Sequence, residues 1–424
     1  MRSPSLGVIL FMLLVSVAIL APGCLMKNPA AIKIGAIYPF TGPSASAGLD
    51  IKNGILLATD IVNNEYNVNL PLARTKGIPS LGGAKIEIVF EDSQGSTILG
   101  RFQAQRLIDE ENVVTLVGCY HSAVTAEASG IAEDKGIPFL TFLSTAPSLT
   151  QRAFKWFFST TPDEETFVHN FFLFLRDVQE KTGKTIDKLA LVHENSIWGT
   201  EIAELEERYA REHGYSVALD ISYSADTENV TNEVQRLKDV NPDVVLQASY
   251  SNDAVLFMKN YKALDFNPPA ILADDAGFID PRFTQSLCKD GDYILTRMTW
   301  CRDLSESQPL IHEVNQIFRE RYGTEMNDNS ARAFTGILVL AETINRGGSI
   351  NPDAIRKALL ETDISGDKLI MPWDGVRFDP NTHRNILGRG IICQIIEQEY
   401  YTVWPWNMAT RELIWPAPEW AARE

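Results

Sequence analysis

The stretch Ile34-Gly35-Ala36-Ile37-Tyr38, followed by Pro39-Phe40-Thr41-Gly42-Pro43, decides the fold of this chain. Its first half is a short apolar run, which predicts a strand, and the prolines and glycine of its second half predict a loop. Residues 49–63 then predict a helix. From residue 33 onward, short apolar runs alternate with longer amphipathic ones in the same way. This alternation is typical of a parallel sheet covered by helices.

The alternation passes through two successive units. Four strands are predicted in each, at 34–38, 86–90, 113–117 and 138–143 in the first unit and at 189–192, 217–223, 243–246 and 270–272 in the second. Helices are predicted next at 310–322, 330–346 and 352–361, followed by antiparallel strands at 390–396 and 400–404. The sequence therefore predicts an α/β fold with two doubly wound parallel-sheet lobes.

No low-complexity linker separates the two units, so we expect the lobes to be joined by three extended crossings. The hinges are placed near 159–162, 293–297 and 386–390. The expected division of the chain is a signal peptide at 1–23, an N-terminal lobe at 31–158 plus 297–386, a C-terminal lobe at 163–293 plus 390–408, and a C-terminal tail at 409–424.

Size and composition restrict the class of protein. The 424 residues are 45% hydrophobic and 22% charged, which is typical of a soluble globular protein long enough for two domains. The formal net charge of −17 argues against nucleic acid or an anionic lipid surface as the main partner, because both bind clusters of lysine and arginine. After the N-terminal region, no stretch of sequence is long and apolar enough to span a membrane.

The cysteines are too few for a disulfide scaffold in a chain of this size. Cys288 and Cys301 flank one predicted strand, so they either form a bridge or remain free. Cys119 and Cys393 lie in apolar strands and are predicted to be buried thiols. No histidines or cysteines have the spacing of a metal site, and we expect neither a metal nor another cofactor.

The N-terminus is typical of an exported protein. Residues 6–20 form an uninterrupted apolar run that is short for a membrane span, and small residues follow it where a signal peptidase cuts. The run ends at Cys24, which resembles the lipobox cysteine of bacterial lipoproteins and would then be acylated as the first mature residue. Ala21 departs from that pattern, which favours leucine there. Ordinary cleavage after Gly23 and an uncleaved anchor are the alternatives.

Polar side chains follow the strands of the first unit. In an open parallel sheet, ligands bind in the crevice beyond the carboxyl ends of the strands. The loop after the third strand holds Ser122, placed as the N-cap of a helix that begins at Ala123, and the loop after the fourth holds Ser144 and Thr145. The exposed N–H groups at that helix N-terminus favour an anion such as a carboxylate.

The equivalent loops of the second unit offer the aromatic residues Trp198 and Tyr250 and the acidic pair Asp274 and Asp275. If the two units face each other, one wall binds an anion and the other a cation, and a zwitterion satisfies both. Each residue also has a purely structural interpretation. The serine is then only a helix cap, the threonine a turn former, the tryptophan a packing residue, the tyrosine a surface aromatic and the aspartates solvated.

Several motifs resemble one known family. The opening stretch 34–43 is similar to the first strand and loop of the type I periplasmic-binding-protein fold, in the solute receptors of amino acid and amide ABC transporters. Gly118 with Ser122 four residues later, and Gly136-Ile137-Pro138 running to Pro147, also match. The likeness covers nearly the whole mature chain and is greatest to the branched-chain amino acid receptors.

The resemblance implies roles for individual residues. It places Ser122, Thr145 and the backbone of Leu143 at the ligand carboxylate, and Asp275 at the ammonium, although an alignment shift would select Asp274 instead. Its aromatic positions, normally tyrosines, fall at Trp198 and Tyr250. We also expect Ser144 at the ligand. The ligand's side chain would lie in a candidate pocket formed by Tyr120, His121, Tyr38 and Phe40.

The expected function is that of a non-catalytic receptor that closes two lobes over a small solute and delivers it to an ABC permease. We expect a monomer, exported to the periplasm or cell surface and anchored by lipid at Cys24. A sensor that reports to a chemoreceptor or kinase would use the same fold and pocket. An exported enzyme is the third possibility, but the sequence has no nucleophile elbow, phosphate loop or dinucleotide-binding motif.

Overall fold

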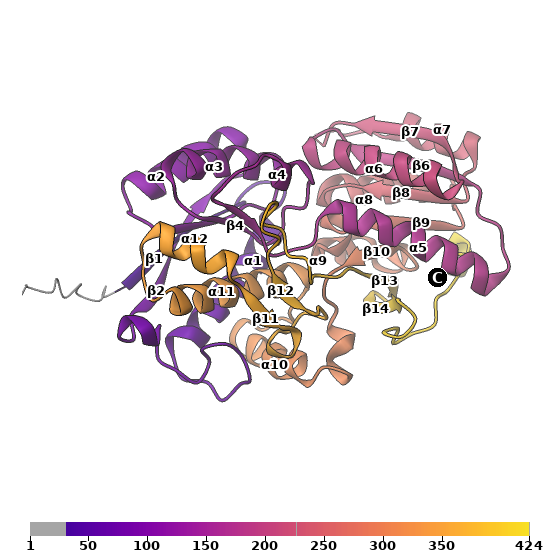
Figure 1. Cartoon of the computed structure of the whole chain (residues 1–424). Coiled ribbons are helices and arrows are strands. Elements are labelled where there is room, and N and C mark those ends of the chain that lie inside the picture. Colours follow the sequence, from indigo (N-terminus) through magenta and orange to yellow (C-terminus); the bar gives the residue numbers. More distant parts are fainter. Residues whose placement is uncertain (1–30, 226, 424) are drawn as a thin grey trace, which may run out of the picture.

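The computed structural model describes residues 31–225 and 227–423 and shows two lobes, each built on a sheet with helices on both faces (Figure 1). The predicted fold of two parallel-sheet lobes is confirmed. The predicted signal peptide and Cys24 lie outside the described residues.

The first lobe is built on a five-stranded parallel sheet with the order β2-β1-β3-β4-β5. Its strands are β1 (Ala31–Tyr38), β2 (Lys85–Asp92), β3 (Thr115–Gly118), β4 (Phe139–Thr141) and β5 (Phe157–Ser159). Successive side chains of a strand point to opposite faces, so Ile34 and Ala36 enter one hydrophobic core and Ile37 enters the other. The apolar run 34–38 is therefore buried on both faces of the sheet.

Helices from distant parts of the sequence cover this sheet. On one face α1 (Ala45–Asn63) packs against α11 (Asp328–Gly347), and on the other α2 (Thr97–Asp109) packs against α3 (Ser122–Lys135). The orange late helices lie beside the indigo early ones in Figure 1. The first lobe also contains α4 (Ser148–Gln151), α10 (Pro309–Tyr322), α12 (Pro352–Leu360) and the short antiparallel pair β11 (Asp363–Ser365) and β12 (Gly375–Arg377).

The second lobe is built on a seven-stranded sheet with the order β14-β13-β10-β9-β8-β6-β7. The parallel strands are β6 (Lys188–Glu194), β7 (Ser216–Tyr223), β8 (Val244–Ala248), β9 (Ala270–Asp274) and β10 (Leu295–Met298). The two last strands, β13 (Ile391–Ile396) and β14 (Glu399–Trp404), are antiparallel, as the sequence predicts.

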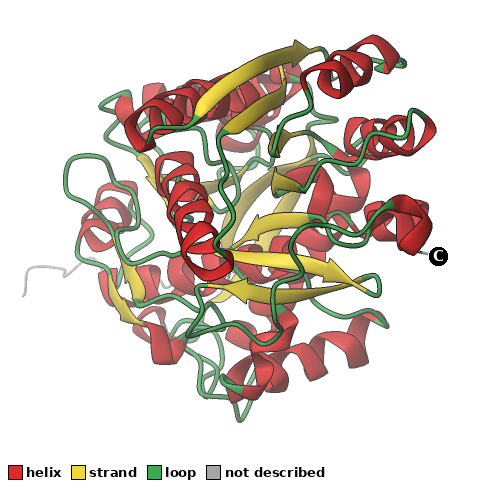
Figure 2. Cartoon of the chain, turned by 90° about the vertical axis from the view of Figure 1, so that its right-hand side faces the viewer, coloured by secondary structure: helices red, strands yellow, loops and turns green. Residues whose placement is uncertain are grey.

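Helices also cover both faces of the second sheet, which Figure 2 shows with the strands between two layers of helices. Leu189 and Leu191 of β6 face the core beneath α5 (Glu164–Thr182) and α6 (Ile197–His213). Ala190 and Val192 face the opposite core. The helices on that side are α7 (Thr231–Val240), α8 (Ser251–Ala263) and α9 (Pro281–Leu287).

The chain crosses between the lobes after β5, after β10 and before β13. The first and third crossings are joined, because the Ser159 N–H donates to the His383 carbonyl at 3.1 Å and the Asn385 N–H donates to the Ser159 carbonyl at 2.9 Å. The second crossing differs from the expected hinge at 293–297. The sheet ladder with β13 continues to Met298, so the chain leaves the second lobe only after that residue.

The cysteines and the C-terminal tail are also placed. Cys288 is exposed and Cys301 is buried, and both are free, so the candidate bridge between them is not formed. Cys119 and Cys393 are buried thiols, as predicted. The tail packs on the second lobe, where the Trp420 indole N–H donates to the Phe266 carbonyl at 3.2 Å. Among the described helices, none has the length and apolar character to cross a membrane.

The contact between α1 and α11 gives a test of the first lobe. A Cβ added at Gly54 of α1 would lie 2.2 Å from the Ser330 carbonyl oxygen of α11, so Gly54→Ala forces the helices apart. We expect it to destabilise the protein by about 1–3 kcal/mol, measured by chemical denaturation.

The matched control is Gly130→Ala, because Gly130 lies inside α3 and a Cβ there meets no atom within 4 Å. It should be neutral or stabilising by up to about 1 kcal/mol, since alanine is the better helix former. Equal effects of the two variants would contradict the close packing.

Candidate ligand-binding site

The two lobes bring residues from both parts of the sequence to one small buried cavity of about 20 Å³. The lining residues are Tyr120, Ser122, Leu143, Thr145, Trp198, Tyr250, Asp275, Ala276 and Arg332. Seven of these are residues that the sequence predicts at the ligand. Their juxtaposition follows from the rule that loops at the carboxyl ends of parallel strands share one edge of the sheet.

Four residues predicted at the ligand lie elsewhere. Tyr38 is fully buried in a core of the first lobe, and Phe40 packs edge-on against Phe90 with the ring centroids 5.6 Å apart.

The other two are Ser144 and His121. Ser144 is buried behind the cavity, where its hydroxyl donates to the Cys119 carbonyl at 2.9 Å and contacts the Thr125 hydroxyl at 2.6 Å. His121 borders a separate, larger chamber described below. Of the acidic pair, Asp275 lines the cavity, while Asp274 ends β9 behind it and is fully buried.

The first lobe presents hydroxyl groups to the cavity. Helix α3 begins at Ser122 and His121 is its N-cap, so the expectation that Ser122 caps a helix beginning at Ala123 is wrong by one residue. Because Ser122 is already helical, its Oγ is not used as a cap and instead accepts from the Ala146 N–H at 3.4 Å. The second hydroxyl, of Thr145, donates to Oε1 of Glu164 in the opposite lobe.

The second lobe presents a carboxylate that is already ion-paired. Oδ2 of Asp275 accepts from Nη1 of Arg297 and from Nη2 of Arg332, each at 2.8 Å. Arg297 also reaches Oδ1 of Asp274 at 3.2 Å and Oε1 of Glu164. Because Arg332 belongs to the first lobe and Asp275 to the second, their ion pair spans the cleft. We call Glu164, Asp274, Asp275, Arg297 and Arg332 the charged cluster.

Burial sets the protonation of the charged cluster. Desolvation lowers the pKa of Arg297, which is 1% exposed, but Asp275, Glu164 and Asp274 more than offset this and raise its pKa above the ordinary value. Desolvation raises the pKa of Glu164, although Arg297 opposes the shift. It also raises the pKa of Asp274, with Glu164 as the next cause. Arg297 therefore stays charged, and Glu164 and Asp274 hold protons more tightly than usual.

Aromatic side chains close the cavity. The Trp198 indole N–H donates to Oε1 of Glu164 at 2.8 Å, and its ring centroid lies 5.0 Å from that of Tyr250. Tyr250 in turn lies 6.0 Å from Tyr120 of the other lobe. The tryptophan is thus held by the charged cluster and forms one wall of the cavity with Tyr250.

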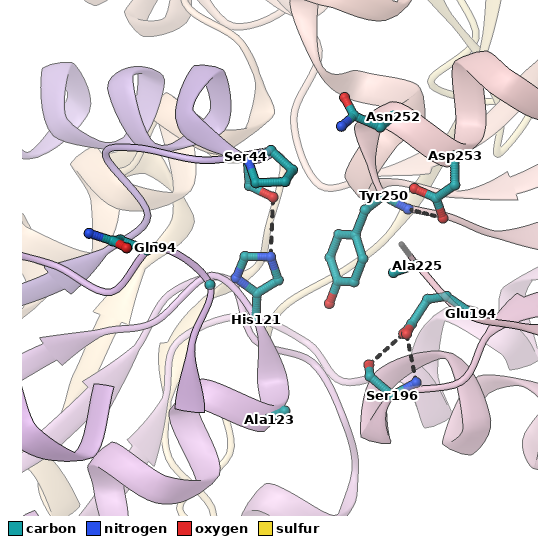
Figure 3. Close-up of a pocket in the computed structure, with 12 residues that line it drawn as sticks. Ser44, Gln94, His121, Ala123, Glu194, Ser196, Ala225, Tyr250, Asn252 and Asp253 are labelled. Carbon is teal, nitrogen blue, oxygen red and sulfur yellow. Dashed lines mark hydrogen bonds between the residues drawn. The ribbon is translucent and has the colours of Figure 1, made fainter. Parts of the chain in front are cut away.

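A chamber of about 270 Å³ lies beyond Tyr250 and is lined by both lobes (Figure 3). On the first-lobe side His121 contacts the Ser44 hydroxyl at 3.1 Å, and its ring lies 4.8 Å from Tyr250. Burial lowers the pKa of His121 to about 4, so the ring is neutral at pH 7. On the second-lobe side Glu194 accepts from the Ser196 hydroxyl at 2.5 Å. Polar side chains from both lobes therefore line part of this outer chamber.

The comparisons with known proteins identify the family and the fold. The model of the periplasmic binding protein family matches residues 31–391, so the chain belongs to that family. A relative is the Leu/Ile/Val-binding protein homolog 7 of Brucella suis biovar 1 (strain 1330), 28% identical over 409 residues that cover 95% of this chain and 98% of the relative.

Two solved structures share the fold. The leucine-binding protein LivK of Thermotoga maritima MSB8 aligns with a TM-score of 0.76 at 19% identity, covering 88% of this chain and 98% of that one. A solute-binding protein of an ABC transporter from Rhodopseudomonas palustris BisB5, in complex with 3,4-dihydroxybenzoic acid, aligns with a TM-score of 0.73 at 17% identity, covering 93% and 100%. The resemblance predicted from the sequence is confirmed. The family binds solutes for ABC transporters and is not enzymatic, so the chain is not an enzyme.

The outer chamber gives a test by pH. Asp253 accepts from the Tyr250 N–H at 3.1 Å and from the Tyr223 hydroxyl at 2.5 Å, and burial raises its pKa to about 7. The Asp253 carboxylate thus binds a proton more tightly in the folded state than in the unfolded state. The resulting stabilisation is complete below about pH 4 and is lost as the pH rises to about 7.

Asp253→Asn keeps a neutral side chain at every pH. Its melting temperature relative to the wild type should therefore be higher at pH 8 than at pH 4. The control is Asp239→Asn on the exposed side of α7, which should follow the wild type at both values. If the difference in melting temperature between Asp253→Asn and the wild type does not change with pH, the raised pKa of Asp253 is contradicted.

Proposed function

We propose that this chain is an extracytoplasmic solute-binding receptor of an ABC importer, and that it binds an amino acid or a related small zwitterion in the cleft between its lobes. One observation carries the proposal. The hydroxyls of Ser122 and Thr145 from one lobe meet the carboxylate of Asp275 from the other at a single buried cavity.

The two walls have the chemistry that a zwitterion needs. The Ser122 hydroxyl and the N-terminus of α3 suit a carboxylate, because N–H groups and the helix dipole favour negative charge. Opening of the lobes would free the Thr145 hydroxyl from Glu164, so that it could donate to the same carboxylate. Asp275 suits an ammonium, and its Oδ2 carries both arginines, which leaves Oδ1 for the ligand. Both ligand charges must be matched on closure, because an unpaired buried charge costs several kcal/mol.

Binding requires the lobes to open. The cavity of about 20 Å³ has room for about one water molecule, far less than an amino acid. The three crossings are the segments that would absorb the rotation, as in other hinged domain closures. Opening separates Arg332 from Asp275, and closing over a ligand would restore that ion pair beside the ligand's ammonium group. The relatives named for Leu/Ile/Val binding support an amino acid as the ligand class.

Asp275→Asn tests the assignment of the ammonium site. The probe is the amino acid that raises the melting temperature most in a screen of all twenty, and calorimetry measures its affinity. We expect a loss of more than tenfold, with a smaller loss for the 2-hydroxy acid of the same side chain, because the hydroxy acid has no ammonium.

Circular dichroism must first show that this variant is folded, since Asp275 also holds two arginines. Asp239→Asn is the matched surface control and should bind like the wild type. Unchanged affinity of Asp275→Asn for the amino acid would remove the ammonium site. Selective binding of the hydroxy acid by the wild type would replace the zwitterion with a simple acid.

We further propose export and lipidation at Cys24, which would hold the receptor near its permease. The wild type expressed in a bacterium should carry acyl chains on Cys24, detected by mass spectrometry of its N-terminal peptide. Cys24→Ala should lose this mass and should not be retained by membranes. An unacylated wild-type N-terminus would leave ordinary secretion or an uncleaved anchor.

A further inference from the structure

The inner cavity offers little aliphatic surface. Of its lining residues, only Leu143 and Ala276 have aliphatic side chains, and the others are aromatic, hydroxyl-bearing or charged. A leucine, isoleucine or valine side chain held here would desolvate polar groups without replacing their hydrogen bonds. Such a mismatch disfavours a ligand by much more than a missing methylene does. The cavity lining therefore lacks the aliphatic surface that a branched aliphatic side chain requires.

Tyr120 supplies a hydrogen-bonding group that the protein does not use. The residue follows β3, is 7% exposed and lines the cavity, with its ring edge-on to His121 at 5.0 Å. Its hydroxyl is buried and has no hydrogen-bond partner among the described residues. Burial, with Asp275 nearby, raises the pKa of this phenol well above its ordinary value, so it remains a neutral donor and acceptor.

Helix α11 supplies one more such group. Arg332 lines the cavity and pairs through Nη2 with Asp275 and Asp328, each at 2.8 Å, while its Nε has no partner within the described chain. Asn329 is fully buried three residues earlier on the helix, and within the same residues both its amide atoms lack a partner, but it lies outside the cavity lining.

Charge decides what these groups can accept. The carboxylates of Glu164, Asp274, Asp275 and Asp328 surround only two guanidinium groups, those of Arg297 and Arg332. Even where burial keeps Glu164 and Asp274 protonated, the ion pairs with Asp275 and Asp328 use the charge of both arginines. A second ligand carboxylate would therefore lack a cationic partner here. A neutral side chain with both an acceptor and a donor would satisfy the arginine N–H and the phenol without that penalty.

We infer that Tyr120 and Arg332 form a side-chain subsite for a neutral polar group, so that the ligand is a carboxamide amino acid such as glutamine or asparagine. This inference rests on the proposed function, because it assumes that the ligand's carboxylate and ammonium groups bind at Ser122, Thr145 and Asp275. It names a ligand class different from that of the relatives' Leu/Ile/Val names.

The test is calorimetry of the purified protein with L-glutamine, L-asparagine, L-leucine and L-glutamate. One of the two carboxamides should bind at least tenfold tighter than leucine and than glutamate. Tyr120→Phe keeps the ring and removes only the hydroxyl, so it should weaken carboxamide binding about five- to tenfold and leave leucine binding unchanged.

The control is Tyr322→Phe, since the Tyr322 hydroxyl is also buried without a described partner but belongs to α10, outside the cavity lining. It should bind all four amino acids like the wild type. Leucine bound as tightly as the carboxamides would overturn the subsite and leave the receptor function standing. Tighter binding of glutamate would overturn its neutral character, and binding of no amino acid at all would overturn the zwitterion proposal and the subsite together.

Discussion

The guanidinium of Arg297 is the group on which the candidate site depends. It holds Glu164 from the start of α5, Asp274 at the end of β9 and Asp275 in the following turn. The ladder between β9 and β10 already places Asp274 beside Arg297, and the shared cation ties Glu164 of α5 to both. Removing one partner of such a buried network leaves an uncompensated charge and typically costs about 3–5 kcal/mol. The ion pairs of Arg297 with Glu164 and Asp274, which hold the cavity wall in place, therefore lie behind that wall.

The fold and most of the cavity could be predicted because their signals are local. A run such as 34–38 predicts a buried strand by its own composition, and the position of Ser122, Thr145, Trp198, Tyr250 and Asp275 after strands brings them to one edge. The helix start at Ser122 differs by one residue because no serine cap is needed there. The second crossing was placed too early because the sequence does not show how far the sheet ladder extends.

The arginines were missed because their partners are distant in the sequence. Arg297 is 133 residues from Glu164, and Arg332 is 57 residues from Asp275. No spacing rule covers such separations. A weak signal does exist, since each arginine interrupts an otherwise apolar segment, in β10 and in the buried part of α11. A charged residue inside a predicted core element is worth treating as part of a site, because burying it alone would be prohibitively costly.

Asp328 connects the ligand wall to the second crossing. Its Oδ1 accepts from the N–H and the hydroxyl of Thr299 at 2.7 and 2.6 Å, while its Oδ2 pairs with Arg332. One carboxylate therefore anchors both the segment that must rotate and the cation that lines the cavity. In the proposed receptor, a solute that drew the arginine toward it would change the hold on Thr299 as well. Occupancy and lobe geometry are then linked through a single side chain, and by the reciprocity of linkage a strained crossing would alter the affinity for the solute.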